Sequence, residues 1–280
     1  MSELADSHAD HHDDPMSHVP PPSPWPFVTG MSLVLFSVGA VLSLPRTAED
    51  VGGGVPILIV GLLGVLFGLM GWCHQIIQEK RIAHDLDAQQ VDLKMFVKGF
   101  LVSELMAFAA VFAYFYMRTF FVDPTSFRPP SGVHLGGELV AFATFLLLSS
   151  SVTCELAHHA VVHGQMFKAR MLMLTTLILG FVFLGFQGRE YGELITHGFW
   201  PLSMGAEDHP HTAYMATFFI ATGFHGFHVL TGLIMLFLVY LRMEMGHFTA
   251  KRHFSLVAAS WYWHFVDIVW VLLFITVYVV

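Results

Sequence analysis

Seven long apolar stretches constrain what this chain can fold into more than any other feature of its sequence. Each has about 20 or more mostly apolar residues, the length that a helix needs to cross a bilayer. Continuous apolar runs of this length exclude a transmembrane β-barrel, whose strands alternate over about ten residues. The sequence therefore predicts an all-α integral membrane protein with seven transmembrane helices. They cover about residues 26–44, 55–78, 96–120, 136–160, 170–189, 213–241 and 255–279.

The composition excludes several other classes of protein. Hydrophobic residues make up 55% of the 280 residues and charged residues only 12%, whereas a soluble domain has about 25% charged residues. A water-soluble core of this size cannot bury so much apolar surface, so a soluble enzyme is excluded. The formal net charge of -8 does not suit a nucleic-acid-binding protein. Cys73 and Cys154 both lie in apolar runs and indicate no disulfide framework.

Residues 1–24 are acidic, rich in histidine and then rich in proline, which predicts a disordered tail on the inside. Residues 25–280 form the membrane domain. Lysine and arginine are enriched in loops on the inner side of a membrane. Nine of them lie beside the tail or in the loops after the second, fourth and sixth spans, against four on the other side. The N-terminus is therefore predicted inside and the C-terminus outside, with a long charged loop at about 79–95 separating the first two spans from the other five.

Five titratable side chains lie deep inside the predicted spans, where such groups are costly and usually functional. They are Glu104, His225, His228, His264 and Asp267. Glu104 must be neutral, paired or facing a polar cleft, because an ionised carboxyl facing lipid costs several kcal/mol. Two interpretations of Glu104 are equally open here. It is a carboxyl that handles protons or faces a lipid headgroup, or a protonated carboxyl that hydrogen-bonds a neighbouring helix.

The histidines allow either a metal site or simple helix packing. His225 and His228 are three residues apart, so they share a helix face and could supply two metal ligands. The fourth span ends in a cluster similar to membrane di-iron sites, formed by Glu155, His158, His159 and His163. The spacing favours interpretations without a metal. His225 and His228 then make interhelical hydrogen bonds or contact lipid, and the cluster of the fourth span is a helix end among headgroups. The pair and the cluster also lie at different depths, which argues against one di-metal site.

The seventh span contains further polar and aromatic groups. His264 and Asp267 are three residues apart and could pair within one helix. Trp261, Trp263 and Trp270 lie too deep to form only an interface belt, so they are predicted to pack against another helix of this or another subunit. The residues by themselves indicate no redox centre.

Longer motifs connect the chain to a known family. The most specific are FFIATGFHGFHVLTG at 218–232 and HFTAKRHFSLVAASWYWHFVDIVWVLLF at 247–274. Shorter ones are WPF at 25–27, SELMAF at 103–108, RPPSG at 128–132, SVTCELAHHAVVHG at 151–164 and LGFQGREYGE at 184–193. On these residues the chain resembles subunit III of the haem-copper oxidases, specifically of aa3-type cytochrome c oxidase. The resemblance implies two groups of helices, spans 1–2 and spans 3–7, around a V-shaped cleft that holds phospholipids.

The resemblance also implies a set of lipid-binding residues. Glu104 matches a carboxyl that faces the lipid in the cleft, and His228 matches a histidine near a phosphatidylglycerol-type headgroup. Arg242 and His247 match positions that contact cardiolipin headgroups. Cations and imidazoles suit phosphate oxygens, so the chemistry of these positions is consistent with that role.

The chain departs from the family pattern near the end of the second span. Where the family shows W-W-R-D-V-x-R-E, this chain has WCHQIIQE at 72–79. Glu79 matches the last residue of that motif, and His84 is what remains of the histidine-rich turn that follows. These two residues complete the lipid-binding set that the resemblance implies.

The function implied by the resemblance is that of a non-redox accessory subunit in a proton-pumping oxidoreductase. No catalytic residue, haem or metal is expected in this chain, and haem a, haem a3 and copper belong to partner subunits. The chain would pack mainly on subunit I, with subunit II also in the complex. It would bind phospholipid, stabilise the catalytic core and support proton uptake while cytochrome c reduces oxygen to water.

Two alternatives come from other classes. One is a subunit III-like protein of a quinol oxidase or nitric oxide reductase, although quinol-oxidase members commonly have five spans. The other is a membrane di-iron enzyme that uses the histidines of the fourth and sixth spans. The lack of a targeting segment and the basic inner loops predict a bacterial inner membrane in preference to a mitochondrial one, although a chain made inside an organelle would look similar.

Overall fold

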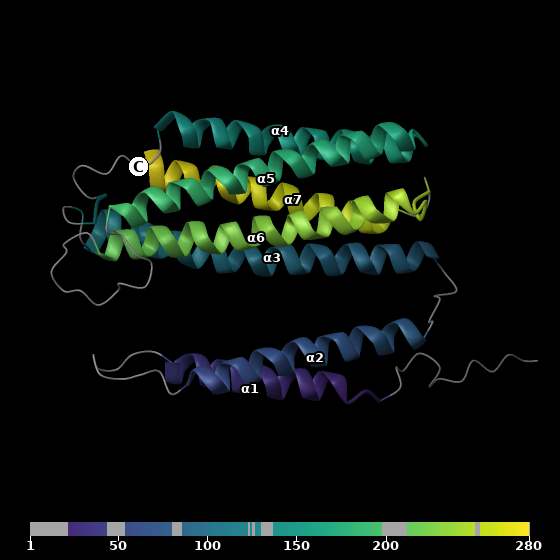
Figure 1. Ribbon diagram of the computed structural model, residues 1–280, viewed down its shortest axis with the longest axis horizontal. Coiled ribbons are helices and arrows are strands. Elements are labelled where there is room, and N and C mark those ends of the chain that lie inside the picture. The colour runs from purple at the N-terminus through teal and green to yellow at the C-terminus, as the bar shows by residue number, and fades with distance from the viewer. Residues whose placement is uncertain are drawn as a thin grey trace, which may run out of the picture. The chain divides into compact units, whose positions relative to one another are not determined.

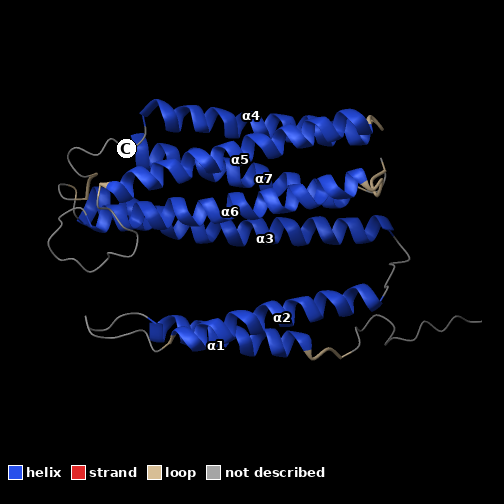
Figure 2. Cartoon of the chain, in the orientation of Figure 1, coloured by secondary structure: helices blue, strands red, loops and turns tan. Residues whose placement is uncertain are grey.

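The computed structural model of the chain describes residues 22–43, 54–79, 86–122, 124, 127–129, 137–197, 212–249 and 253–279. These residues are almost entirely helical and contain no strand (Figures 1 and 2). Seven helices among them are long and apolar enough to cross a membrane, which confirms the predicted all-α membrane fold. They are α1 (Trp25–Ser43), α2 (Val55–Glu79), α3 (Leu86–Met117), α4 (Gly137–Val162), α5 (Met166–Thr196), α6 (Thr212–Glu244) and α7 (Phe254–Leu273).

Several helices are longer than their predicted spans. α3 begins at Leu86, whereas its predicted span begins at 96, so the prediction of a loop over 79–95 is wrong from Leu86 onward. α5 likewise continues to Thr196, past the predicted end at 189. Hydropathy detects only the part of a helix that lies in lipid, whereas the backbone hydrogen bonds continue wherever the sequence tolerates them. α3 and α7 also run directly into short π-helical segments, η1 (Arg118–Val122) and η2 (Phe274–Val279).

The chain divides into two compact units, Met1–His84 and Asp85–Val280. This division agrees with the predicted grouping of spans 1–2 and spans 3–7. The predicted tail lies outside the described residues except for 22–24. The cleft implied between the two groups and the inside position of the N-terminus stay predictions.

Glycine brings α1 and α2 together in the first unit. A Cβ atom at Gly39 would meet the backbone of Leu58, and one at Gly61 would meet the backbone of Phe36. The two helix backbones are therefore in direct contact at these points. Lipid tails are as apolar as leucine, so helices in a bilayer associate by such close van der Waals packing rather than by the hydrophobic effect.

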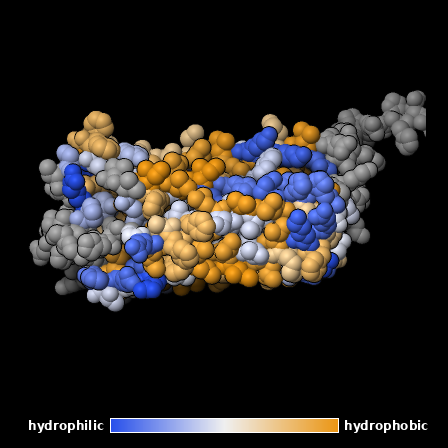
Figure 3. Space-filling model, turned by 90° about the horizontal axis from the view of Figure 1, so that it is seen from above, coloured by the Kyte–Doolittle hydropathy of each residue, from blue (hydrophilic) through white to orange (hydrophobic). Residues whose placement is uncertain are grey.

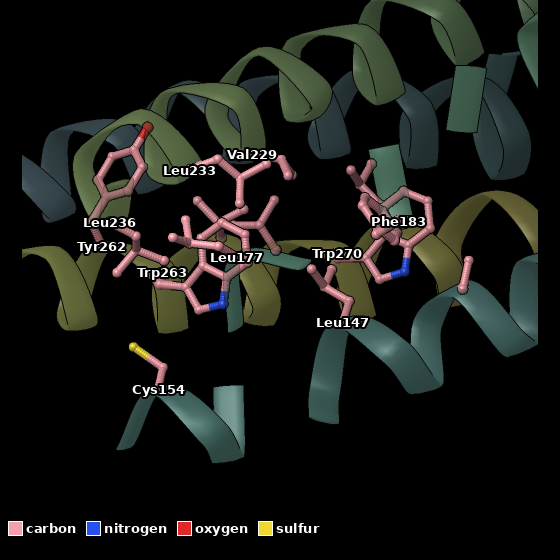
Figure 4. Close-up of a cluster of buried hydrophobic side chains, with 14 of the residues drawn as sticks. Leu147, Cys154, Leu177, Phe183, Val229, Leu233, Leu236, Tyr262, Trp263 and Trp270 are labelled. Atoms are coloured by element: carbon pink, nitrogen blue, oxygen red, sulfur yellow. The ribbon is translucent and has the colours of Figure 1, made fainter. Parts of the chain in front are cut away.

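α7 is the central helix of the second unit. It packs against α3, α4 and α6, while α4 packs on α5 and α5 packs on α6 (Figure 1). In its most apolar stretch 61% of the residues are buried, a larger share than in any other of the described spans. Trp263 and Trp270 both belong to the buried core of this unit. Trp270 lies beside Phe183 of α5 and near Leu147 of α4, whereas Trp263 lies closer to Leu177 of α5 (Figure 4).

The two buried tryptophans of α7 are anchored to α4 by hydrogen bonds. The indole N–H of Trp263 donates to Ser150 Oγ at 3.0 Å, and that of Trp270 donates to Thr144 Oγ1 at 2.9 Å. A buried indole N–H needs such a partner. The prediction that these tryptophans pack against another helix is therefore confirmed for both. Trp261 is half-buried and lies under the ammonium group of Lys98, 5.6 Å from its ring centroid.

Two helix ends of the second unit share one turn geometry. Gly164 after α4 and Gly246 after α6 have φ angles of +73° and +72°. In each case the residue after the glycine donates its N–H across the turn, from Gln165 to the carbonyl of Ala160 and from His247 to that of Arg242. This is the pattern of a Schellman motif, in which glycine avoids the steric cost of a positive φ.

The surface reflects the membrane environment. In the face shown in Figure 3, hydrophobic residues cover the middle of the molecule and hydrophilic residues gather toward its two ends. At one end the hydrophilic residues reach further along the molecule than at the other. Large exposed apolar side chains occur on every described spanning helix, as lipid-facing helices require.

Candidate functional site

Glu104 and His228 pair between α3 and α6. Glu104 Oε2 lies 3.1 Å from Nε2 of His228, and Nδ1 of His228 donates to the carbonyl oxygen of Phe224 at 2.8 Å. Because a carbonyl oxygen only accepts, Nδ1 carries a proton. Nε2 then accepts a hydrogen bond from a neutral carboxyl or, as imidazolium, donates one to a carboxylate. In either form one proton lies between Glu104 and His228.

Aromatic rings hold this pair in place. The ring of His228 lies 5.0 Å from that of Phe108 and stacks at 14° on Tyr262, with 6.3 Å between centroids. The side chain of His228 is 6% exposed and that of Glu104 is 23% exposed. The carboxyl is therefore reachable from outside the second unit, whereas the imidazole is enclosed. The structure shows the interhelical bond of Glu104, and its contact with a lipid headgroup stays a prediction.

His225 points to different neighbours. It is 1% exposed, and its ring lies 5.0 Å from Trp270 of α7 and 6.3 Å from Phe183 of α5. Neither ring nitrogen has a hydrogen-bond partner in the described part of the chain. His225 and His228 therefore do not act as a pair, although their spacing allowed two metal ligands. No three His, Cys, Asp or Glu side chains among the described residues are placed to hold a metal ion.

The polar groups of the seventh span are joined through α4 rather than directly. His264 Nδ1 lies 3.0 Å from Ser151 Oγ, and the hydroxyl of Ser151 donates to Asp267 Oδ2. The pairing of His264 with Asp267 that their spacing allows is thus mediated by a serine. His264 Nε2 lies 3.3 Å from Ser260 Oγ and 3.5 Å from Glu155 Oε2.

The histidine cluster at the end of α4 separates into two parts. Glu155 Oε1 lies 3.6 Å from His158 Nδ1, and the ring of His158 is 5.6 Å from that of His253, which precedes α7. His159 instead stacks on His163, with 4.0 Å between ring centroids. Both are exposed at the helix end, in agreement with a place among headgroups. Within the predicted cluster Glu155 therefore contacts His158, whereas His159 and His163 contact each other.

Two of the predicted headgroup-binding residues lie at the turn between α6 and α7. Arg242 is exposed, donates from Nη1 to Ser255 Oγ at 3.1 Å, and lies over the ring of Phe248 at 5.3 Å. His247 is exposed in the same turn. Glu79 ends α2, but its side chain and all of His84 lie outside the described residues.

Sequence reasoning missed the serines that connect these groups. Ser150 binds Trp263, and Ser151 joins His264 to Asp267. A signal was present, because Ser151 lies four residues before Glu155 and so shares its helix face. Serine is small and common in membrane helices, where its hydroxyl also bonds within its own helix, so spacing alone does not reveal such a role.

Together the fold and these groups define a polytopic helical membrane protein with titratable side chains paired between its helices. The family model described as cytochrome c oxidase subunit III matches residues 16–280, so the chain belongs to that family. It is 34% identical over 266 residues to cytochrome c oxidase subunit 3 of Arabidopsis thaliana, covering 93% of this chain and 95% of that protein. The subunits 3 of Marchantia polymorpha and Branchiostoma lanceolatum are 35% and 34% identical, each over 93% of this chain and 95% of the relative. The chain is thus related to subunits of an oxidoreductase complex of the respiratory chain.

The relatives correct the predicted location. They come from land plants, algae and a lancelet, and they indicate the mitochondrial inner membrane, so the prediction of a bacterial inner membrane is wrong. The reason lies in the basic inner loops that carried that prediction. A chain that is made inside the organelle has such loops too, so they do not separate the two membranes.

Proposed function

We propose that this chain is the accessory subunit III of an aa3-type cytochrome c oxidase, packed mainly on subunit I in a complex that also contains subunit II. The observation that carries the proposal is the family match over 16–280, nearly the whole chain. In this role the chain makes and breaks no bonds in the reduction of oxygen. It stabilises the subunits that carry haem a, haem a3 and copper, and it supports their proton uptake.

The arrangement of the described side chains supports a structural role. Aromatic and aliphatic side chains fill the interior of α3–α7, and the histidines there are held by carbonyl, carboxyl and aromatic neighbours. The exposed apolar surface is available for lipid and for apolar partner helices.

We also propose that the turn between α6 and α7 binds an acidic phospholipid headgroup. Arg242 and His247 are exposed at a helix end, where a guanidinium and an imidazole meet phosphate at the level of the headgroups. Ser255 holds the guanidinium from one side without neutralising its charge. Glu104, His228, Glu79 and His84 belong to the proposed cleft site, which the resemblance implies.

The test of the function is purification of the tagged chain from native membranes in mild detergent. We expect the complex to show haem a in its reduced-minus-oxidised spectrum and to consume oxygen with reduced cytochrome c. A complex that consumes oxygen only with a quinol would replace the proposal by the quinol-oxidase alternative. A haem-free preparation that holds stoichiometric iron would contradict it altogether.

The lipid proposal has its own test in the purified complex. Arg242→Gln is expected to lower the amount of tightly bound anionic phospholipid, measured by mass spectrometry of extracted lipid. Arg189→Gln is the matched control, because Arg189 is an exposed arginine near the end of α5 that pairs with Glu193 at 3.1 Å. Equal lipid content in the two variants and the wild type would remove Arg242 from the proposed site.

A further inference from the structure

Six polar side chains form a line along the contact between α4 and α7. This line, the polar seam, runs in the order His253, His158, Glu155, His264, Ser151 and Asp267. Its first step is a ring contact of 5.6 Å, its next two are contacts of 3.6 and 3.5 Å, and its last two are hydrogen bonds. α4 and α7 alternate in supplying the groups after Glu155, so the seam exists only when the two helices pack together.

The polar seam passes from an exposed end to a buried end. The side chain of Glu155 is 61% exposed and that of His264 is 33% exposed, whereas Asp267 is 4% exposed. His253 directly precedes α7, and Asp267 lies 14 positions later, about 21 Å along a helix that rises about 1.5 Å per residue. A hydrocarbon core is about 30 Å thick. The seam therefore leads from the headgroup level at the start of α7 to a depth well inside the membrane.

The buried end of the seam keeps one polar atom that the described residues do not satisfy. Oδ1 of Asp267 is buried and has no hydrogen-bond partner among the described residues. Asp267, Ser151 and His264 also line an open groove of about 480 Å³, whose other walls are apolar. A carboxyl placed so deep without a second partner is costly if packing is its only role. If the only role of this position were to join α4 to α7, a hydroxyl side chain in place of the carboxyl would be sufficient.

We propose that the polar seam is a proton relay, through which the Asp267 carboxyl exchanges protons with water at the start of α7. Chains of Asp, Glu and His inside membrane helices are the usual material of such relays. An imidazole suits this task because it binds a proton at one nitrogen and releases one from the other. The relay goes beyond the accessory role proposed above and does not depend on the electron donor of the complex.

The proton balance of the relay is simple. His158 gives its Nδ1 proton to the Glu155 carboxylate and regains one from water, directly or through His253. Glu155 then protonates Nε2 of His264, and His264 releases its Nδ1 proton to Ser151 Oγ as the hydroxyl of Ser151 passes its own proton to Asp267 Oδ2. The net change is one proton moved from water to the Asp267 carboxylate. No other bond changes and nothing is oxidised or reduced.

The other titratable groups around α7 are engaged elsewhere. On α4 the thiol of Cys154 donates to Ser260 Oγ at 3.7 Å. On α6 and α3, His228 and Glu104 pair with each other, and His225 faces Trp270. The pH response of Asp267 is therefore expected to depend on Glu155 and His264 more than on these groups.

The experiment follows the Asp267 carboxyl in the intact purified complex by infrared spectroscopy after a rapid change of pH. The infrared band that changes with pH is assigned to the Asp267 carboxyl if it is absent from the Asp267→Asn variant. Glu155→Gln interrupts the relay at an exposed position, where it leaves the packing intact. We expect it to slow protonation of Asp267 by about tenfold or more, the change that a barrier higher by about 1.4 kcal/mol produces.

His159→Gln is the matched control, because His159 neighbours His158 on α4 but stacks on His163 outside the seam. In this variant the protonation rate of Asp267 is expected to equal the rate in the wild type. His264→Gln provides a second interruption, and the haem content of each preparation verifies assembly. An unchanged rate in both Glu155→Gln and His264→Gln would overturn the relay, and so would an Asp267 band that does not respond to pH in the assembled wild type.

Discussion

The two units of this chain use different means to hold helices together in lipid. α1 and α2 approach through glycines until their backbones touch, and most of their large side chains stay exposed. α3–α7 are joined by buried aromatic rings whose polar atoms are hydrogen-bonded across helices. Both arrangements follow from the same fact, that lipid provides no hydrophobic drive for helices to associate. The first relies on close van der Waals contact, and the second adds volume and polar bonds.

The largest effect is expected at the centre of the second unit. Trp263→Ala leaves a cavity beside Gly180 and Gly232 and removes the bond to Ser150. We expect the free energy of unfolding to fall by about 3 kcal/mol, at the low end of values for buried tryptophan because lipid also solvates apolar surface. Titration with SDS in mixed micelles measures this change. Trp261→Ala, on the same helix but half-buried, is expected to cost clearly less, and equal costs would contradict the central role of Trp263.

A smaller loss is expected from bulk placed between α1 and α2. Gly61→Leu sets a side chain against the backbone of Phe36, and overpacking of this kind costs about 1–3 kcal/mol. Spin labels at the exposed positions Phe27 and Met70 are expected to show a longer and broader distance distribution. Gly30→Leu is the control, because nothing lies within 4 Å of a Cβ atom there. If the two variants behave alike, glycine packing does not join these helices.

The hydrogen bond between Glu104 and His228 in the second unit is expected to contribute still less to the free energy of unfolding. A double-mutant cycle with Glu104→Gln and His228→Gln isolates the bond between these side chains. Interhelical hydrogen bonds in membranes contribute about 0.6 kcal/mol on average and up to about 1.7 kcal/mol. We expect a coupling energy in this range from the same SDS titration. A coupling near zero would mean that aromatic packing alone joins α3 to α6.

The smallest effect is expected at the surface. Arg189 and Glu193 pair at 3.1 Å on α5, but their side chains are 66% and 60% exposed. Exposed pairs one helical turn apart contribute about 0.3–0.5 kcal/mol. Arg189→Gln is therefore expected to change the free energy of unfolding by no more than this. A larger loss in the assembled complex than in the isolated chain would show that a partner subunit contacts this end of α5.

Much of the fold was predictable because hydropathy is a local property. All seven spans were located, and the grouping of α1–α2 apart from α3–α7 followed from the charged stretch between them. The helix ends were less predictable, since the polar start of α3 and the end of α5 form helix without being apolar. The sequence showed which titratable residues lie deep in the spans, but it did not show which side chains they contact. The spacing of His264 and Asp267 allowed them to pair within one helix, whereas Ser151 of another helix joins them.

The amino-acid sequence by itself determined which segments cross the membrane, the family to which the chain belongs and which spans carry titratable groups. These properties depend on the composition and order of residues along single helices. The partition of apolar residues into lipid decides which segments cross the membrane, and side-chain spacing decides which residues share a helix face. Only the tertiary structure decided that His228 meets Glu104, that His225 meets aromatic rings, and that the seam from His253 to Asp267 is continuous. Such contacts depend on how helices are rotated and shifted against one another, and packing between distant segments sets that geometry.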